Sequence, residues 1–150
     1  MASVRKATEA DIPRILELYR QLELNPSPGS VDPSPEDCLG VVRSVSATPG
    51  QELLVAEENG RVAGTMMVVI VPSLAHHASP WAVVEHMVVE EKLRSRGIGK
   101  ALMDYAVAKA KAAGCYKIML SSNKKRQDAH RFYRSLGFTA THEGFHLYLK

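Results

Sequence analysis

The chain contains little cysteine and few aromatic side chains. Of its 150 residues, two are Cys, one is Trp and 6% are aromatic. Cys38 and Cys115 lack the Cys-x-x-Cys spacing of zinc and redox sites, and two thiols are too few for a disulfide framework. We therefore predict that both cysteines are structural, and a reducing compartment would keep them as thiols.

A long apolar run and a large charge excess are missing as well. No segment approaches the roughly 20 apolar residues that cross a bilayer, and the first residues do not form a basic region followed by an apolar signal core. We therefore expect the protein to stay in the cytoplasm. The 19 Lys and Arg are nearly offset by 16 acidic residues, which leaves a net charge of +3. We expect no membrane association and no nucleic-acid partner.

The rest of the composition is that of an ordinary globular protein. The hydrophobic fraction is 45%, and the sequence has neither an internal repeat nor a low-complexity segment. A chain of this length buries roughly two thirds of its unfolded surface. We predict a single domain over residues 1–150.

The first half of the sequence predicts a strand, two helices and a hairpin. Residues 8–11 are Thr-Glu-Ala-Asp, a capping box with Asp in the acid position, and apolar residues then recur at helical spacing. Asn59-Gly60 is the strongest short signal for a hairpin turn. Residues 25–35, rich in Pro, Ser and Gly, predict a loop beside the substrate site. The expected elements are a strand at 4–7, helices at 12–22 and 35–47, and strands at 52–57 and 61–71.

The second half predicts strands that alternate with helices after a polar turn at residues 72–80. Gly114 and Gly137 stand where two of the helices should end. A strand, a helix and a further strand in this order form a parallel crossover unit. The expected strands are 81–89, 116–121, 138–141 and 145–149, and the expected helices are 97–113 and 126–136.

A basic turn with two glycines lies between the strand at 81–89 and the helix that follows it. Glycines let the backbone approach a ligand, and the first N–H groups of a helix have no partner within the helix. The helix dipole and the charges of Arg94, Arg96 and Lys100 add positive potential. The turn therefore predicts a polyphosphate site. It lacks the third glycine and the acidic residue of the dinucleotide fingerprint, and it lacks the Gly-Lys-Ser/Thr of a P-loop.

Two motifs together carry a resemblance to a known family. Arg94-x-x-Gly97-x-Gly99 resembles the Arg/Gln-x-x-Gly-x-Gly/Ala motif by which the GNAT superfamily of N-acetyltransferases binds the pyrophosphate of acetyl-CoA. Asn123 and residues 128–138, with Phe132-Tyr133-x-x-x-Gly137-Phe138 at their core, resemble the second cofactor motif of that family. The sequence is similar in particular to glucosamine-6-phosphate and aminoalkylphosphonate acetyltransferases.

The resemblance implies a fold, a cosubstrate and a set of cofactor residues. The fold would be the α/β GNAT fold, with a central mixed, mostly antiparallel sheet, a parallel strand-helix-strand crossover and flanking helices. Acetyl-CoA would be the cosubstrate. Ser95 stands where the family often has Gly, and its hydroxyl could itself bind phosphate. The residues assigned to the cofactor are Met87, Val88, Val89, Arg94, Ser95, Arg96, Gly97, Ile98, Gly99, Lys100, Asn123 and Arg131.

Two residues are candidates for acid–base catalysis. Glu85 aligns with a carboxylate near the acceptor amine in glucosamine-6-phosphate acetyltransferases. Strand alternation places Glu85 on the face of Met87, where apolar walls would raise the pKa of its carboxyl, and places His86, a competing base, on the opposite face. The alternative is a carboxylate with a structural partner. Tyr133 occupies the family's tyrosine position, where a phenol can protonate the leaving thiolate; the alternative is core packing.

The activity that we predict is transfer of acetyl from acetyl-CoA to the primary amine of a small acceptor, by direct attack in a ternary complex. The resemblance favours an anionic acceptor. The alternatives are acetylation of a protein N-terminus or lysine, and a non-catalytic acyl-CoA-binding module. His76-His77, together with residues 128–133 and 141–145, resembles aminoalkylphosphonate acetyltransferases, some of which use a divalent ion, but we assign no metal ligands. The terminal strands leave a sheet edge, and the resemblance suggests a homodimer.

Overall fold

The computed structural model describes residues 1–22 and 31–150 of the chain. They form two units, Met1–Met119 and Leu120–Lys150, each of which is described by itself. Of the loop predicted at residues 25–35, the part up to residue 30 lies outside the described residues.

A five-stranded sheet in the order β1-β2-β3-β4-β5 forms the centre of the first unit. Neighbouring strands are antiparallel except β4 and β5, which are parallel. Asn59 and Gly60 have φ angles of 53° and 74°, as the predicted two-residue hairpin turn requires. The predicted mixed, mostly antiparallel sheet is confirmed. The strands are β1 (Ser3–Lys6), β2 (Gln51–Glu58), β3 (Arg61–Val71), β4 (Trp81–Val89) and β5 (Ile118–Met119).

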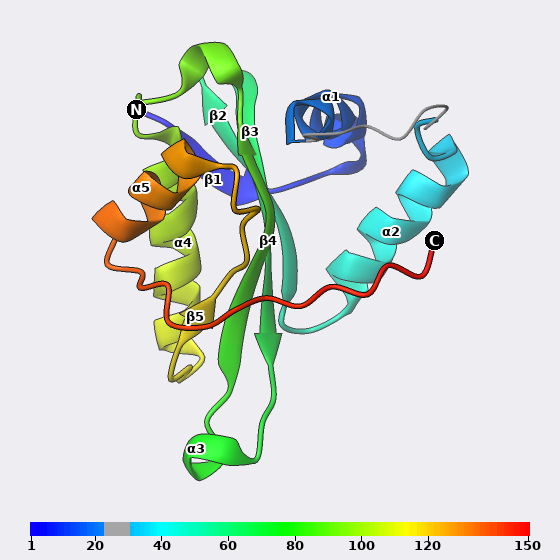
Figure 1. Cartoon of the computed structure of the whole chain (residues 1–150). Helices are drawn as coiled ribbons and strands as arrows, with labels where there is room; N and C mark the ends of the chain where they lie inside the picture. The colour runs from blue at the N-terminus through cyan, green and yellow to red at the C-terminus, as the bar shows by residue number, and fades with distance from the viewer. Residues whose placement is uncertain (23–30) are drawn as a thin grey trace. The chain divides into compact units, whose positions relative to one another are not determined.

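Helices cover both faces of this sheet. The helices α1 (Ile12–Leu22) and α2 (Pro35–Ala47) lie on one face, and α4 (Ile98–Ala112) lies on the other (Figure 1). Ile15 and Leu18 of α1 pack with Val88 in a buried cluster on the first face. On the second face, a Cβ on Gly64 would lie 3.2 Å from side-chain atoms of Ile98 and Leu102. The glycine therefore permits close packing of α4 on β3.

The start of α1 has the predicted cap. A short 3₁₀ helix, Glu9–Asp11, precedes α1. The carboxylate of Asp11 accepts a hydrogen bond from the amide of Thr8 at 2.7 Å. Arg5 donates two hydrogen bonds to the same carboxylate, at 2.7 and 2.9 Å. These hydrogen bonds lower the pKa of Asp11. The capping box therefore also joins α1 to β1.

The strand β4 contains a bulge that the sequence pattern did not reveal. Thr65 pairs with Val88 and Met67 pairs with Glu85, so two steps along β3 match three steps along β4. The extra residue lies at His86, whose φ is 49°. A bulge reverses the alternation of the residues beyond it. Glu85 therefore shares a face with Val88 rather than with Met87, and the predicted alternation is wrong here.

The connection between β3 and β4 is also less regular than a simple turn. It contains a single helical turn, α3 (Ala75–Ala78), in which His76 and His77 have φ angles of 50° and 59°. The ring of His76 stacks on that of Tyr116, with centroids 3.9 Å apart. The strand β5 is shorter than the predicted 116–121, because its pairing with β4 ends at Val83, before the bulge.

The second unit contains α5 (Gln127–Ser135), close to the predicted helix at 126–136. Gly137 has a φ of 93° and ends the helix as predicted. The predicted strands at 138–141 and 145–149 are wrong: among the described residues, no strand follows β5. The amide of Phe138 donates to the carbonyl of Tyr133 at 3.1 Å, so the chain is still completing the helix end where a strand was expected. Residues 145–149 do not pair with any strand of the described residues. Their apolar pattern is therefore not sufficient to form a strand.

Candidate active site

The predicted phosphate-binding turn has the geometry of an anion site. Ser95 and Gly97 have φ angles of 63° and 84°, and α4 begins at Ile98. The first hydrogen bond of α4 runs from the amide of Ala101 to the carbonyl of Gly97, at 2.9 Å. Within the described parts of the chain, the six amides of residues 95–100 donate to no protein acceptor. Free amides at a helix N-terminus bind anions.

The basic side chains of the turn differ in their partners. Arg96 lies 3.7 Å from Glu58, and Lys100 forms a 2.6 Å ion pair with Asp104 one turn along α4. Arg94 donates through Nε to the carbonyl of Val89 at 3.3 Å. Among the residues described, Arg94 is paired with no carboxylate, so its charge is the least compensated of the three.

The residues that lead to this turn lie at the end of β4. Met87 and Val88 are buried, and Val89 is half-buried. Val88 belongs to the core cluster under α1, which fixes the strand between the bulge and the turn. A bulge interrupts the ladder of strand hydrogen bonds and leaves main-chain groups without a strand partner. Met87 to Val89 thus lie between two interruptions of regular structure, the bulge at His86 and the turn before α4.

Glu85 and His86 are both exposed, whereas Trp81 and Val83 on the same side of β4 are half-buried. The expected apolar enclosure of Glu85 is thus absent, and Met87, one of its expected walls, lies on the other face. His86 is turned by the bulge toward α1, where its ring centroid lies 5.7 Å from that of Tyr19. Strand alternation had separated His86 from Glu85 on opposite faces, and the bulge removes this separation.

Tyr19 is one of the residues that recur at helical spacing in the predicted helix at 12–22. It is half-buried, and burial raises the pKa of its phenol. Its place beside His86 depends on the bulge, for which the sequence contains no glycine or proline signal. Helical periodicity alone could therefore not distinguish this tyrosine from a core residue.

The other predicted site residues belong to the second unit. Tyr133 is half-buried between Phe132 and Phe138, with ring centroids at 5.5 and 6.0 Å, and burial raises the pKa of its phenol. The side-chain oxygen of Asn123 accepts a hydrogen bond from the amide of Lys125 at 2.9 Å, so this oxygen has a structural partner in the turn before α5. Arg131 is exposed and forms an ion pair with Asp128.

Comparison with known proteins identifies the family. The sequence profile of the Acetyltransferase (GNAT) family matches residues 12–138. The chain belongs to this family. The predicted resemblance, the predicted fold and the classification as an acetyltransferase are thereby confirmed.

Individual relatives of this GNAT protein differ in their named substrates. The aminoalkylphosphonate N-acetyltransferase of Salmonella typhimurium is 35% identical over 65% of this chain and 62% of its own length. A peptidyl-lysine N-acetyltransferase of Escherichia coli is 30% identical over 90% of this chain and 82% of its own. The chain therefore spans less than two thirds of the first of these relatives. The crystal structure of glucosamine-6-phosphate N-acetyltransferase from Arabidopsis thaliana shares the fold, with a TM-score of 0.84, 23% identity and coverage of 100% of this chain and 99% of that one.

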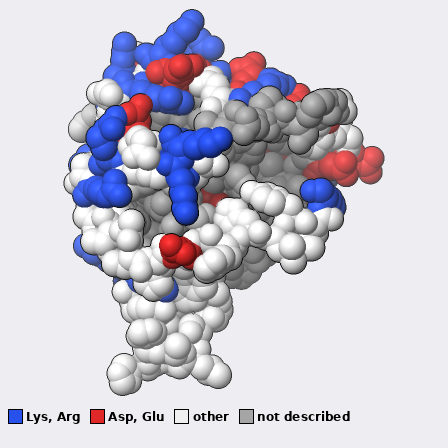
Figure 2. Space-filling model, in the orientation of Figure 1, with Lys and Arg blue, Asp and Glu red and all other residues white. Residues whose placement is uncertain are grey.

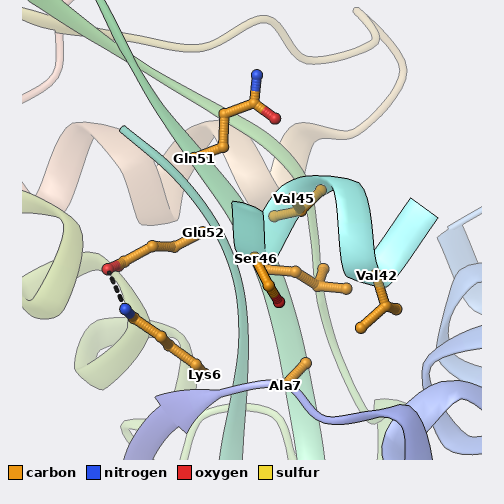
Figure 3. Close-up of a pocket in the computed structure, with 8 residues that line it drawn as sticks. Lys6, Ala7, Val42, Val45, Ser46, Gln51 and Glu52 are labelled. Carbon is orange, nitrogen blue, oxygen red and sulfur yellow. Dashed lines mark ion pairs between the residues drawn. The ribbon is translucent and has the colours of Figure 1, made fainter. Parts of the chain in front are cut away.

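A cavity lies elsewhere in the first unit of the GNAT protein, between β1, β2 and α2. Its volume is about 110 Å³, and Val42, Ser46 and Glu52 are among its lining residues (Figure 3). Binding sites for small molecules usually measure roughly 300 Å³ or more. Glu52 is already paired with Lys6 and Lys109, at 3.4 and 3.2 Å, and accepts Tyr105 Oη at 3.0 Å. This cavity contains none of the predicted site residues.

Three further properties bear on possible ligands. On the face shown in Figure 2, acidic side chains lie among the basic ones, in keeping with the small net charge. No group of three or more His, Cys, Asp or Glu side chains in residues 1–22 and 31–150 is arranged to hold a metal ion. No helix in these described ranges has both the length and the apolar character needed to cross a membrane.

Proposed function

We propose that the protein transfers acetyl from acetyl-CoA to the primary amine of a small acceptor, by direct attack in a ternary complex. The observation that carries this proposal is the row of unpartnered amides at residues 95–100, which follows β4 and opens α4. In a GNAT protein this is the place for the pyrophosphate of the cosubstrate. The acetyl-CoA thioester supplies the activated acetyl group.

The residues present fit such a ligand. A Cβ on Gly97 would meet no atom within 4 Å, so the space beside the turn is open to a phosphate. The amides of residues 95–100 and the guanidinium of Arg94 would bind the pyrophosphate. The main chain at Met87 to Val89 would bind the pantetheine arm, and a backbone N–H beside the bulge would stabilise negative charge on the thioester oxygen.

The acid and base come from two different parts of the chain in this proposal. Glu85 attracts the ammonium of the acceptor and takes its proton, directly or through a water. His86 is the second candidate for this base, because the bulge exposes it together with Glu85. Tyr133 keeps its phenol protonated because burial raises its pKa, so the phenol can donate a proton to the departing thiolate.

We propose further that the two units act as one acetyltransferase domain. The family profile runs from residue 12 to residue 138 and so includes parts of both units. In this proposal Asn123 and Arg131 are cofactor residues of the same domain. The side-chain amide nitrogen of Asn123 has no acceptor within the described ranges, which leaves it available to a pantetheine carbonyl.

The acceptor class rests on the named relatives. An aminoalkylphosphonate carries both an amine and an anionic group, which favours a small anionic amine as the acceptor. The peptidyl-lysine acetyltransferase, which matches more of the chain, supports a second candidate, the side-chain amine of a protein lysine. Both acceptors present a primary amine, so the same base and cofactor turn would serve either.

An amine panel assayed for thiol release from acetyl-CoA tests this function. The panel should contain aminoalkylphosphonates, glucosamine 6-phosphate, uncharged primary amines and lysine peptides. We expect turnover with at least one small amine and the highest kcat/KM with an anionic one. Preference for a lysine peptide would favour the second candidate. Tight binding of acetyl-CoA with no turnover on any amine would indicate a binding module instead.

A further inference from the structure

A polar cluster joins α1 to the residues that lead into the cofactor turn. Arg14 and Gln21, seven residues apart on α1, both contact the carboxylate of Glu90: Arg14 forms an ion pair with it, and Gln21 Nε2 donates to it at 3.1 Å. Gln21 Oε1 also accepts the amide of Glu91, at 3.0 Å. The carboxamide of Gln21 thus holds both the side chain of Glu90 and the main chain at Glu91, in the connection between β4 and α4.

Glu90 occupies a particular place in the site. It stands between Met87 to Val89, which precede it, and the turn at residues 94–100, which follows it. Its own amide donates to the carbonyl of Ala63 at 2.8 Å, as the last hydrogen bond between β4 and β3. Beyond it, the chain makes a 3₁₀ turn, Glu91–Leu93, and then enters the cofactor turn. A shift at Glu90 would therefore move both parts of the proposed cofactor site.

The cluster is well placed to hold this point firmly. The side chains of Arg14 and Glu90 are only 18% and 17% exposed, and Arg14 Nε also donates to the carbonyl of Val62 at 3.0 Å. Hydrogen bonds to charged groups away from water are stronger than neutral ones. The hydrogen bond from Arg14 lowers the pKa of Glu90, which keeps it charged.

The turn itself needs external support. Ser95 has a left-handed backbone conformation that a non-glycine residue adopts only where its surroundings hold it. The amides of residues 95–100 have no protein acceptor among the described residues, so their directions are fixed only by the backbone that carries them. Preorganised donors bind a ligand more tightly than donors that must be ordered on binding.

We propose that Gln21 is a positioning residue of the cofactor site, which holds Glu90 and the Glu91 amide and thereby fixes the amides that bind the pyrophosphate. This inference rests on the proposed function. It assigns α1 a part in cofactor affinity although no residue of α1 need touch the cofactor.

Three variants test the role of Gln21, with the dissociation constant of coenzyme A measured by calorimetry in the absence of any amine. Gln21→Leu removes both hydrogen bonds and should weaken binding about three- to tenfold, while kcat at saturating acetyl-CoA changes little. Gln21→Glu places two carboxylates together and should weaken binding more. Adding Glu90→Gln to it should restore binding in part. The carboxylate at position 21 then accepts hydrogen bonds from the carboxamide at position 90 and from the Glu91 amide, while the ion pair of Arg14 with Glu90 is lost.

Tyr105→Phe is the control for a general loss of stability. It removes one hydrogen bond, to Glu52 at 3.0 Å, in a cluster that does not touch the β4–α4 connection. We expect a comparable fall in melting temperature with unchanged coenzyme A affinity. Wild-type affinity in Gln21→Leu, or equal weakening in Tyr105→Phe, would overturn the positioning role alone. Failure of the wild-type protein to bind coenzyme A would overturn the proposed function, and this inference with it.

Discussion

At the scale of single residues, the left-handed conformation of His86 changes which side chains of β4 are exposed. It shifts the alternation of β4 by one position, so that Glu85 and His86 are both exposed while Met87 and Val88 are both buried. Two ionisable groups are thereby presented together beside the segment that leads to the cofactor turn. The choice between them as the base has to be made by substitution.

Glu85→Gln should lower kcat/KM on the best acceptor more than it lowers affinity for acetyl-CoA. The substitution keeps the shape of the side chain and removes the carboxylate that we propose takes the proton. The loss should be partly recovered at higher pH, where more of the acceptor amine is already unprotonated. Steady-state kinetics between about pH 6 and 9.5 would measure both effects.

His86→Gln is the matched comparison for this experiment. It removes the neighbouring ionisable group on the same bulge without changing Glu85. If Glu85→Gln keeps the wild-type rate and pH profile while His86→Gln loses activity, the histidine is the base. If both variants keep them, proton transfer proceeds through a water held by other groups.

Tyr133→Phe should lower kcat by up to about 10²-fold, the size of a full general acid contribution, and leave coenzyme A affinity unchanged. Because burial raises the pKa of Tyr133 above its ordinary value of 10, the wild-type phenol stays protonated through neutral pH and its contribution is lost only as the pH rises through the raised pKa. The variant should therefore lack this alkaline fall in rate.

Phe132→Leu serves as the control for packing around Tyr133, since the two rings lie 5.5 Å apart. It should lower the melting temperature with little change in kcat. A kcat in Tyr133→Phe equal to that of the wild type across the pH range would remove Tyr133 from the mechanism.

At the scale of elements, the proposed cofactor turn at residues 94–100 depends on left-handed backbone at Gly97. A Cβ there would meet no atom within 4 Å, and the same holds for Gly60 in the β2–β3 hairpin, whose φ of 74° is close to the 84° of Gly97. A residue with a side chain would therefore be similarly strained at the two positions, but the surroundings of the two glycines differ. One stands at the start of a helix beside free amides, and the other stands in a hairpin turn.

Gly97→Asp should reduce coenzyme A affinity strongly, because its carboxylate would repel the phosphates and accept the amides that bind them. Gly60→Asp should lower the free energy of unfolding by a similar amount to Gly97→Asp, about 1 kcal/mol for a left-handed residue with a side chain. It should leave coenzyme A affinity unchanged. Calorimetry and thermal unfolding of both variants separate the two effects. Equal coenzyme A affinity in the two variants would place the pyrophosphate elsewhere.

At the scale of the whole molecule, local patterns predicted most of the first unit. The Asn59-Gly60 turn, the capping box at Thr8 and the glycine turn before α4 all depend on contacts between residues near in sequence, and the structure contains each of them. The bulge at His86 and the contacts of Gln21 with Glu90 depend on how distant elements pack, which one sequence does not reveal. The predicted strands at 138–141 and 145–149 failed for the same reason, because a strand exists only with a partner.

Residues 145–149 instead provide the argument for association. Phe145, Leu147, Tyr148 and Leu149 are each 81% to 89% exposed, which is unusual for four large apolar side chains within five positions. We propose that a second copy of the chain covers this segment, so that the protein is a homodimer.

We expect sedimentation velocity to give the dimer mass at tens of micromolar protein, roughly the range in which an interface of standard size stays formed. The pair Leu147→Lys and Leu149→Lys should shift the protein to a monomer, whereas His146→Lys, which adds charge at an already polar position of the same segment, should leave the dimer intact. A monomeric wild-type protein at these concentrations would contradict the dimer, and a dimer that persists in the lysine pair would place the interface on another part of the surface.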